Sequence, residues 1–180
     1  MKIIAFTGMP FSGKSVAVEI AKSTVFPVIR MGDLIWEEVK NQKLELNDEN
    51  VGFVANSIRK KQGKDIWAKR TIEKIKSQNI SDKIIVDGIR NIEEIDLFKK
   101  ELSSNFVLIA ITASDELRKK RAMSRNRIDD SKDIKSIEER DIREIGWGIK
   151  DVISNADIVV SNEQSIEDFR NKIKKILQKI

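Results

Sequence analysis

The residues best suited to chemistry lie near the N-terminus, in the segment GMPFSGKS at residues 8–15. Its spacing is G-x-x-x-x-G-K-S, and it lies between an apolar run and a helical pattern. Gly8 and Gly13 allow the backbone to turn closely around an anion, with convergent amides and a helix N-terminus behind it. Lys14 can reach the β- and γ-phosphates of a nucleotide, and Ser15 can ligate Mg²⁺. The pattern predicts an ATP and Mg²⁺ site made of Gly8, Met9, Pro10, Phe11, Ser12, Gly13, Lys14 and Ser15.

A second candidate is Asp87, which ends the apolar run KIIVD at residues 83–87 and precedes Gly88. A carboxylate at the C-terminal end of a buried strand lies where ligands bind in open α/β sheets. Such a carboxylate can hold a magnesium-bound water. The alternative is a strand-ending turn, because Asp-Gly is common in turns. We favour the metal role.

Several arginines occur together in SDELRKKRAMSRNRIDD, at residues 114–130. Arg121 and Arg125 are four residues apart, so they share one face of a helix, and Arg127 follows closely. Guanidinium groups on one element can neutralise a transferring phosphoryl group. The alternative is a solvated charged helix, and the segment alone does not decide between the two.

The elements that must position these residues are short apolar strands alternating with helical patterns. Near-continuous apolar strands are typical of a parallel sheet covered on both faces, and the alternation predicts one doubly wound α/β domain over residues 1–180. Residues 33–78 hold only helical patterns, which predicts a helical insert over one edge of the active site. Strands are expected at residues 2–7, 26–30, 83–87, 105–112 and 157–160.

Some helix ends are also predicted. Gly63 is expected to end a helix at residues 48–62. Ser114, Ser136 and Ser165 each precede an apolar-periodic stretch and can cap it, the last two with capping-box spacing. Trp147, within GWG, is expected to be structural.

The composition limits the available chemistry. The 180 residues include no His and no Cys, so general-base histidines, disulfides and thiolate zinc sites are excluded. The net charge of +5 suits an anionic partner, but both signs are mixed along the chain, so a nucleic-acid partner is not favoured. No apolar stretch approaches the roughly 20 residues of a membrane span, and the N-terminal run is too short for a signal peptide. We therefore expect a cytoplasmic protein without a membrane partner.

These motifs together resemble the adenylate kinase family, and more narrowly the archaeal adenylate-kinase-related P-loop proteins that are likened to dephospho-CoA kinases. GMPFSGKS is similar to the family's phosphate loop, DELRKKRAMSR to the helix that enters its lid, and RIDD to the R-x-D-D at the lid's exit. The last two motifs abut, which implies a very short lid at residues 121–130. The resemblance implies catalytic roles for Arg121, Arg125, Arg127 and Arg140, with Arg143 as a rival to Arg140.

The resemblance extends to the acceptor side. MGDLIW resembles the family's G-D-L-L-R, with Trp36 in place of the acceptor-binding arginine, and DGIR resembles D-G-F-P-R with one residue missing. Arg59, in the insert, is a candidate to replace the lost charge. Trp36 can stack on a base or pack the insert, and packing is favoured. The implied acceptor-binding residues are Asp33, Trp36, Arg59, Asp87, Gly88 and Arg90.

The implied fold is a three-layer P-loop NTPase domain with a five-stranded parallel sheet in the order 2-3-1-4-5, flanked by helices. The segment at residues 161–164 would lie near the adenine of ATP. The implied function is transfer of the γ-phosphate of ATP to a nucleoside monophosphate, with AMP as the leading candidate. One alternative is transfer to a hydroxyl, as in dephospho-CoA kinase, with Asp33 or Asp87 as the base. The other is an ATP-binding switch or assembly factor that contacts RNA.

Overall fold

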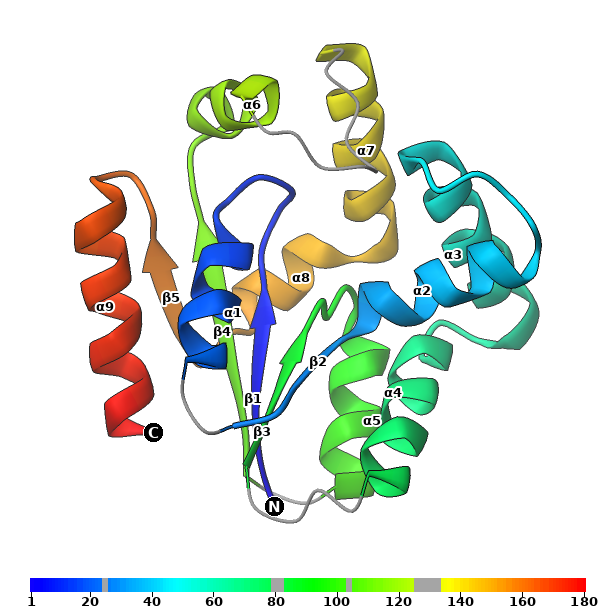
Figure 1. Ribbon diagram of the computed structural model, residues 1–180, viewed down its shortest axis with the longest axis horizontal. Coiled ribbons are helices and arrows are strands. Elements are labelled where there is room, and N and C mark those ends of the chain that lie inside the picture. The colour runs from blue at the N-terminus through cyan, green and yellow to red at the C-terminus, as the bar shows by residue number, and fades with distance from the viewer. Residues whose placement is uncertain (24–25, 79–82, 103–104, 125–133) are drawn as a thin grey trace.

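A parallel sheet forms the centre of the molecule. The computed structural model describes residues 1–23, 26–78, 83–102, 105–124 and 134–180. Among these residues the sheet has five strands in the order β2-β3-β1-β4-β5, and every neighbouring pair is parallel (Figure 1). This order confirms the predicted fold class. The strands are β1 (Lys2–Thr7), β2 (Val28–Arg30), β3 (Lys83–Asp87), β4 (Phe106–Thr112) and β5 (Ile158–Ser161).

Helices connect the strands and cover the sheet. Of the helices in the described part of the chain, none combines the length and the apolar character that a bilayer span requires. They are α1 (Lys14–Lys22), α2 (Met31–Asn41), α3 (Asp48–Gln62), α4 (Ile66–Ser77), α5 (Ile92–Leu102), α6 (Asp115–Ser124), α7 (Ile134–Trp147), α8 (Ile149–Ser154) and α9 (Ile166–Lys179).

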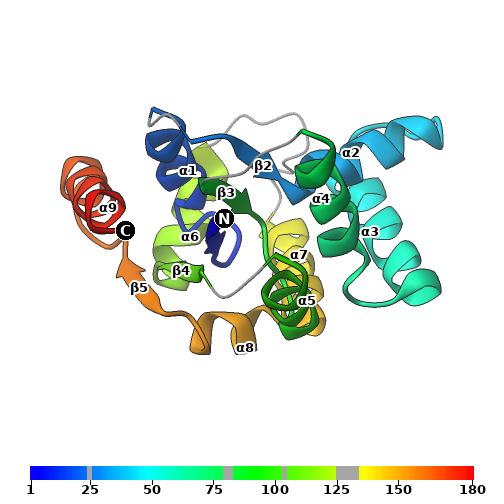
Figure 2. The same cartoon turned by 90° about the horizontal axis from the view of Figure 1, so that it is seen from below.

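Both faces of the sheet are buried, because successive side chains of a strand point to opposite sides. In β1, Ile4 and Phe6 belong to a core cluster that α1 and α9 close. Ile3 and Ala5 belong to a second cluster that α4, α5 and α8 close, together with α2 and α3. Figure 2 shows the same arrangement from below, with α9 on one side of the sheet and α5 and α8 on the other.

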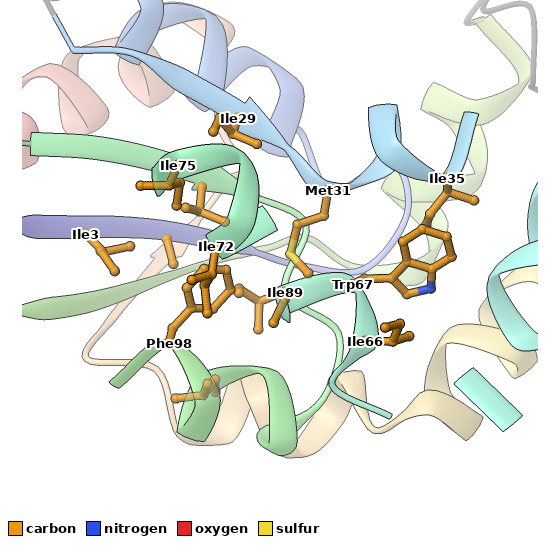
Figure 3. Close-up of a cluster of buried hydrophobic side chains, with 14 of the residues drawn as sticks. Ile3, Ile29, Met31, Ile35, Ile66, Trp67, Ile72, Ile75, Ile89 and Phe98 are labelled. Atoms are coloured by element: carbon orange, nitrogen blue, oxygen red, sulfur yellow. The ribbon is translucent and has the colours of Figure 1, made fainter. Parts of the chain in front are cut away.

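The helices between β2 and β3 share the second cluster instead of forming a separate core. Trp67 of α4 is fully buried, and its Nε1 donates to the carbonyl of Ala55 in α3 at 3.3 Å. Ile35 of α2 lies beside the Trp67 ring, and Met31 lies between this group and the sheet (Figure 3). The first of these helices, α2, begins two residues before the predicted insert. The apolar packing therefore places α2, α3 and α4 against the sheet.

The predicted helix ends are partly confirmed. Gly63 follows the last residue of α3 with φ of 105°, and the Ser165 hydroxyl accepts a hydrogen bond from the amide of Asp168 at 3.1 Å. Ser114 directly precedes α6, as expected. The prediction for Ser136 is wrong: this residue lies inside α7, which begins two residues earlier. The capping-box spacing was therefore not sufficient to locate that helix start.

Candidate active site

The segment between β1 and α1 forms a tight loop at the carboxyl edge of the sheet. Its φ angles are positive at Gly8 (149°), Phe11 (63°) and Gly13 (101°). A Cβ atom at Gly8 would collide with the carbonyl oxygen of Ile111, and one at Gly13 with the side-chain amide of Asn162. Backbone turned in this way presents its amides as a concave anion site. The geometry of the loop itself therefore requires both glycines of the motif.

The outer side of this loop is held by side chains from later parts of the chain. Arg118 Nη1 donates to the carbonyl of Pro10 at 2.9 Å. The carbonyl of Ser12 accepts from Asn162 Nδ2 at 2.8 Å and from Arg121 Nη1 at 3.3 Å. The Ser12 amide donates to the carbonyl of Met9 at 3.2 Å. The other amides of the loop face the inside, where an anion would bind.

Lys14, the first residue of α1, forms an ion pair with Asp87, the last residue of β3. The two residues are 73 positions apart and meet because β3 lies next to β1 in the sheet. Burial lowers the pKa of the Lys14 ammonium, whereas Asp87 raises it in part and the neighbouring Arg90 lowers it again. Asp87 is itself buried. The lysine of the phosphate loop and the second candidate of the sequence analysis, Asp87, therefore belong to the same site.

Beside this ion pair lies a pocket of about 270 Å³. Its walls come from the phosphate loop, the β2–α2 junction, α3, the β3–α5 loop and α7. Residues 8–15 are all described, and of these eight predicted loop residues only Ser12 does not line the pocket. Its side chain is buried behind the loop. The predicted residues that line the pocket are Gly8, Met9, Pro10, Phe11, Gly13, Lys14, Ser15, Asp33, Trp36, Arg59, Asp87, Gly88, Arg90 and Arg140.

Three predicted arginines are not placed in this pocket. Arg121 lies on the outer side of the phosphate loop, where its Nη2 also donates to the carbonyl of Asn162 at 2.9 Å. Arg125 and Arg127 lie outside the described residues, and so does most of the predicted short lid at 121–130. Their catalytic roles stay predictions.

Carboxylates pair with the arginines on the far wall of the pocket. Arg140 Nη1 lies 3.3 Å from Asp48 Oδ1, and Arg143 Nη2 lies 2.7 Å from Asp48 Oδ2. Arg90 forms an ion pair with Glu144. The sequence left Arg140 and Arg143 as rivals, and in the structure both line the pocket and share Asp48. These pairs attach α7 to the N-terminus of α3 and to the β3–α5 loop.

Arg59 is buried in the pocket wall, with 6% of its surface exposed. Its Nη2 lies 3.0 Å from Glu94 Oε1, while Glu94 Oε2 accepts from the backbone amide of Arg90 at 2.7 Å. The Arg59 guanidinium carbon lies 4.4 Å from the centre of the Trp147 ring, a cation–π geometry. Arg59 therefore links α3, α5 and the end of α7.

Sequence reasoning missed Asp48 and Glu144 and assigned Trp147 only a structural role. One signal was available for α7: Arg140, Arg143, Glu144 and Trp147 recur at spacings of three and four, which places them on one face of a helix. Asp48 offered no comparable signal, because an acidic residue in the first turn of a helix is common.

Ser15 and Asp87 are the residues that fit Mg²⁺. Ser15 is exposed at the pocket edge, and Asp87 lines the same pocket beside Lys14. Mg²⁺ prefers oxygen ligands and usually keeps several waters, with substrate phosphates as further ligands, so few protein groups suffice. The described residues contain no group of three or more carboxylates that could hold a metal ion by itself. The donor set therefore suits an ion that arrives with a nucleotide.

The sheet order and the glycine-rich loop before α1 define a P-loop NTPase domain. Residues 7–138 match a family model described as "AAA domain". The chain belongs to the UPF0200 family. It is 44% identical to the UPF0200 protein of Methanosarcina barkeri over 177 residues. This alignment covers 98% of this chain and 95% of the relative.

A second relative and one solved structure are also similar to this chain. The UPF0200/UPF0201 protein of Archaeoglobus fulgidus is 46% identical over 181 residues, which is all of this chain but only 56% of that protein's length. The crystal structure of TT1252 from Thermus thermophilus superposes with a TM-score of 0.63 at 21% identity, over 99% of this chain and 97% of the other. At this identity the structural likeness shows the fold alone. The family supports nucleotide binding, and the narrower relationship to adenylate kinases stays a proposal.

Proposed function

We propose that this chain is an ATP- and Mg²⁺-dependent phosphotransferase that moves the γ-phosphate of ATP to a nucleoside monophosphate, with AMP as the leading candidate. The observation that carries the proposal is the position of the Lys14–Asp87 pair, between the phosphate loop and an arginine-lined pocket. A donor phosphate on the loop and an acceptor in the pocket would meet at this pair. A consumer of ATP and monophosphates belongs in the cytoplasm, which is the compartment we propose.

On the donor side, Lys14 exchanges Asp87 for the β- and γ-phosphates of ATP. Ser15, and Asp87 through a water, would hold Mg²⁺, which would supply positive charge beside the same phosphates. Arg140 neutralises the transferring group from the pocket, and Arg121, Arg125 and Arg127 are candidates for the opposite side. A general base is unnecessary, because the acceptor is already a phosphate oxyanion.

On the acceptor side, Arg90 binds the acceptor phosphate in place of Glu144, its partner in the structure. Asp33, Trp36 and Gly88 border the acceptor, and the helices at residues 33–78 act as the acceptor-binding insert. Arg59 supports this wall through Glu94 and Trp147, and its own contact with the acceptor is secondary. Closure of these helices excludes water, since an open site would hydrolyse ATP.

A coupled assay for ADP formation tests the proposal, with ATP, Mg²⁺ and a panel of nucleoside monophosphates plus dephospho-CoA. We expect ADP formation that requires AMP. The matched variants are Lys14→Ala, which should lose about 10²–10³-fold in turnover, and Lys22→Ala, an exposed lysine of the same helix that should keep it. ADP formation at an equal rate without any acceptor would refute kinase activity, and salt-sensitive RNA binding would then favour an ATP-binding switch.

Transfer to a hydroxyl acceptor is the second candidate function, and one observation supports it. Asp87 forms an ion pair with Lys14, whereas Asp33 lines the pocket without an ion pair to any described residue. A carboxylate in that position can act as the base that a hydroxyl requires. Transfer to dephospho-CoA that Asp33→Asn abolishes, without loss of ATP binding, would support this reading.

A further inference from the structure

The pocket holds six basic side chains, and all but one of them have a carboxylate partner among the described residues. Lys14 pairs with Asp87, and Arg90 pairs with Glu144. The remaining pairs are Arg59 with Glu94, and Arg140 and Arg143 with Asp48. Arg30 also lines the pocket, yet no carboxylate of the described residues lies within ion-pair distance of it. Sequence reasoning did not single out this arginine.

Arg30 lies at the carboxyl end of its strand, on the side of the sheet where phosphate transfer is proposed. It is the last residue of β2 and the register partner of Asp87 in β3. Neighbouring strands are about 5 Å apart, so Arg30 leaves the sheet next to the Lys14–Asp87 pair. Helix α2 begins with the next residue, and its Asp33 and Trp36 line the same pocket.

The charges of the pocket favour an anion at this position. Its six basic side chains face four carboxylates in the lining, Asp33, Asp48, Asp87 and Glu144, which leaves a formal excess of positive charge. An anion that binds Arg90, Arg140 or Arg143 competes with a carboxylate that already neutralises the guanidinium. An anion that binds Arg30 displaces none, and a guanidinium can make two parallel hydrogen bonds to a phosphate.

Arg59 is a weaker candidate for the same task. Its Nη2 is bonded to Glu94, which is completely buried. Drawing Arg59 away would leave a buried carboxylate without its partner, which is costly. Its position in the wall is therefore better explained by support of α3 and Trp147 than by capture of a substrate.

We propose that Arg30 is the residue that captures the phosphate group of the acceptor, and hence that the second substrate must be a phosphate-bearing molecule. The inference rests on the proposed phosphotransfer and adds to it the residue that selects the acceptor class. Arg90 then completes the phosphate contact after Glu144 is displaced.

Calorimetry on the full chain tests the proposal, with AMP titrated in the presence of Mg²⁺ and a non-hydrolysable ATP analogue. Arg30→Gln should weaken AMP binding by about 10- to 100-fold, the loss expected for a charge-assisted hydrogen bond. Arg30→Lys should recover part of the loss. Binding of the ATP analogue and the melting temperature should stay unchanged, because no side-chain hydrogen bond or ion pair joins Arg30 to another residue in the described part of the chain. Arg170→Gln, on the exposed face of α9, is the matched control and should bind AMP normally.

The outcomes separate this inference from the function on which it rests. AMP binding by Arg30→Gln equal to that of the wild-type protein would overturn it, as would a parallel loss of ATP binding and thermal stability. A wild-type protein that binds dephospho-CoA instead of AMP would contradict the AMP assignment, but a loss of that binding in Arg30→Gln would still support capture of a phosphate. Wild-type protein that binds ATP and neither acceptor would overturn both proposals.

Discussion

Arg118 donates to both carboxylate oxygens of Asp141, at 3.0 Å through Nη1 and at 2.6 Å through Nη2. The same guanidinium donates to the carbonyl of Pro10 in the phosphate loop and pairs with Asp115 at 2.7 Å. Arg118 is buried, and its three partners come from α6, α7 and the loop. The Arg118 side chain therefore joins α6, α7 and the phosphate loop on the outer side of the nucleotide site.

This arrangement predicts that Arg118→Lys lowers the free energy of unfolding by about 1–3 kcal/mol and weakens ATP binding, because an ammonium cannot reproduce the planar fork. Urea unfolding and calorimetry with ATP measure the two effects. Asp115→Asn is the control: Asp115 is 84% exposed, and we expect it to change stability by less than about 1 kcal/mol. Equal stability of Arg118→Lys and the wild-type protein would contradict the supporting role.

Asp87→Asn should affect ATP binding in opposite directions with and without magnesium. Without Mg²⁺, removal of the carboxylate frees Lys14 from its ion pair, so ATP should bind more tightly. With Mg²⁺, the loss of the water-mediated ligand should raise the concentration of the ion required for turnover. Titrations of ATP with EDTA and with Mg²⁺ measure both effects. Asp151→Asn, an exposed residue of α8, should change neither, and a uniform loss in Asp87→Asn would indicate misfolding.

The lowered pKa of Lys14 predicts a pH dependence of ATP binding. Bound phosphates favour the charged ammonium, so above the pKa of the free protein ATP binding must take up a proton. Affinity should therefore fall as the pH rises, and the fall should begin at a lower pH than for an ordinary lysine. Calorimetry in buffers of different ionisation enthalpy, between about pH 7 and 10, measures this uptake. Lys14→Arg, whose guanidinium stays charged, should bind no such proton.

Two glycines inside helices should respond differently to alanine. A Cβ at Gly146 in α7 meets nothing within 4 Å, so Gly146→Ala should raise the free energy of unfolding by about 0.5–1 kcal/mol. A Cβ at Gly52 in α3 would lie 2.6 Å from the Arg143 guanidinium carbon and would displace it from Asp48. Gly52→Ala should therefore raise the free energy of unfolding by less than Gly146→Ala does, and it should weaken acceptor binding. Denaturant unfolding and AMP titration of both variants provide the comparison, and equal behaviour of the two would contradict this account.

The strands and the phosphate loop could be predicted because their determinants are local. β1 and β3 are continuous apolar runs, and the loop motif combines turn glycines with a lysine at the start of a helix. The Ser136 error has a local origin too: a capping box is one of several signals, and α7 starts without it. The pairing of Arg140 and Arg143 with Asp48 could not be predicted, because Arg140 lies 92 positions and Arg143 lies 95 positions after Asp48.

By itself, the amino-acid sequence determined the order of strands and helices, the position of the anion-binding loop and the absence of histidine and cysteine chemistry, since each follows from neighbouring residues or from composition. Only the tertiary structure decided which charges remain available to a substrate. Arginines are indistinguishable along the chain, and it is the packing of α3, α5 and α7 that gives Arg59, Arg90, Arg140 and Arg143 their carboxylate partners and leaves Arg30 without one among the described residues.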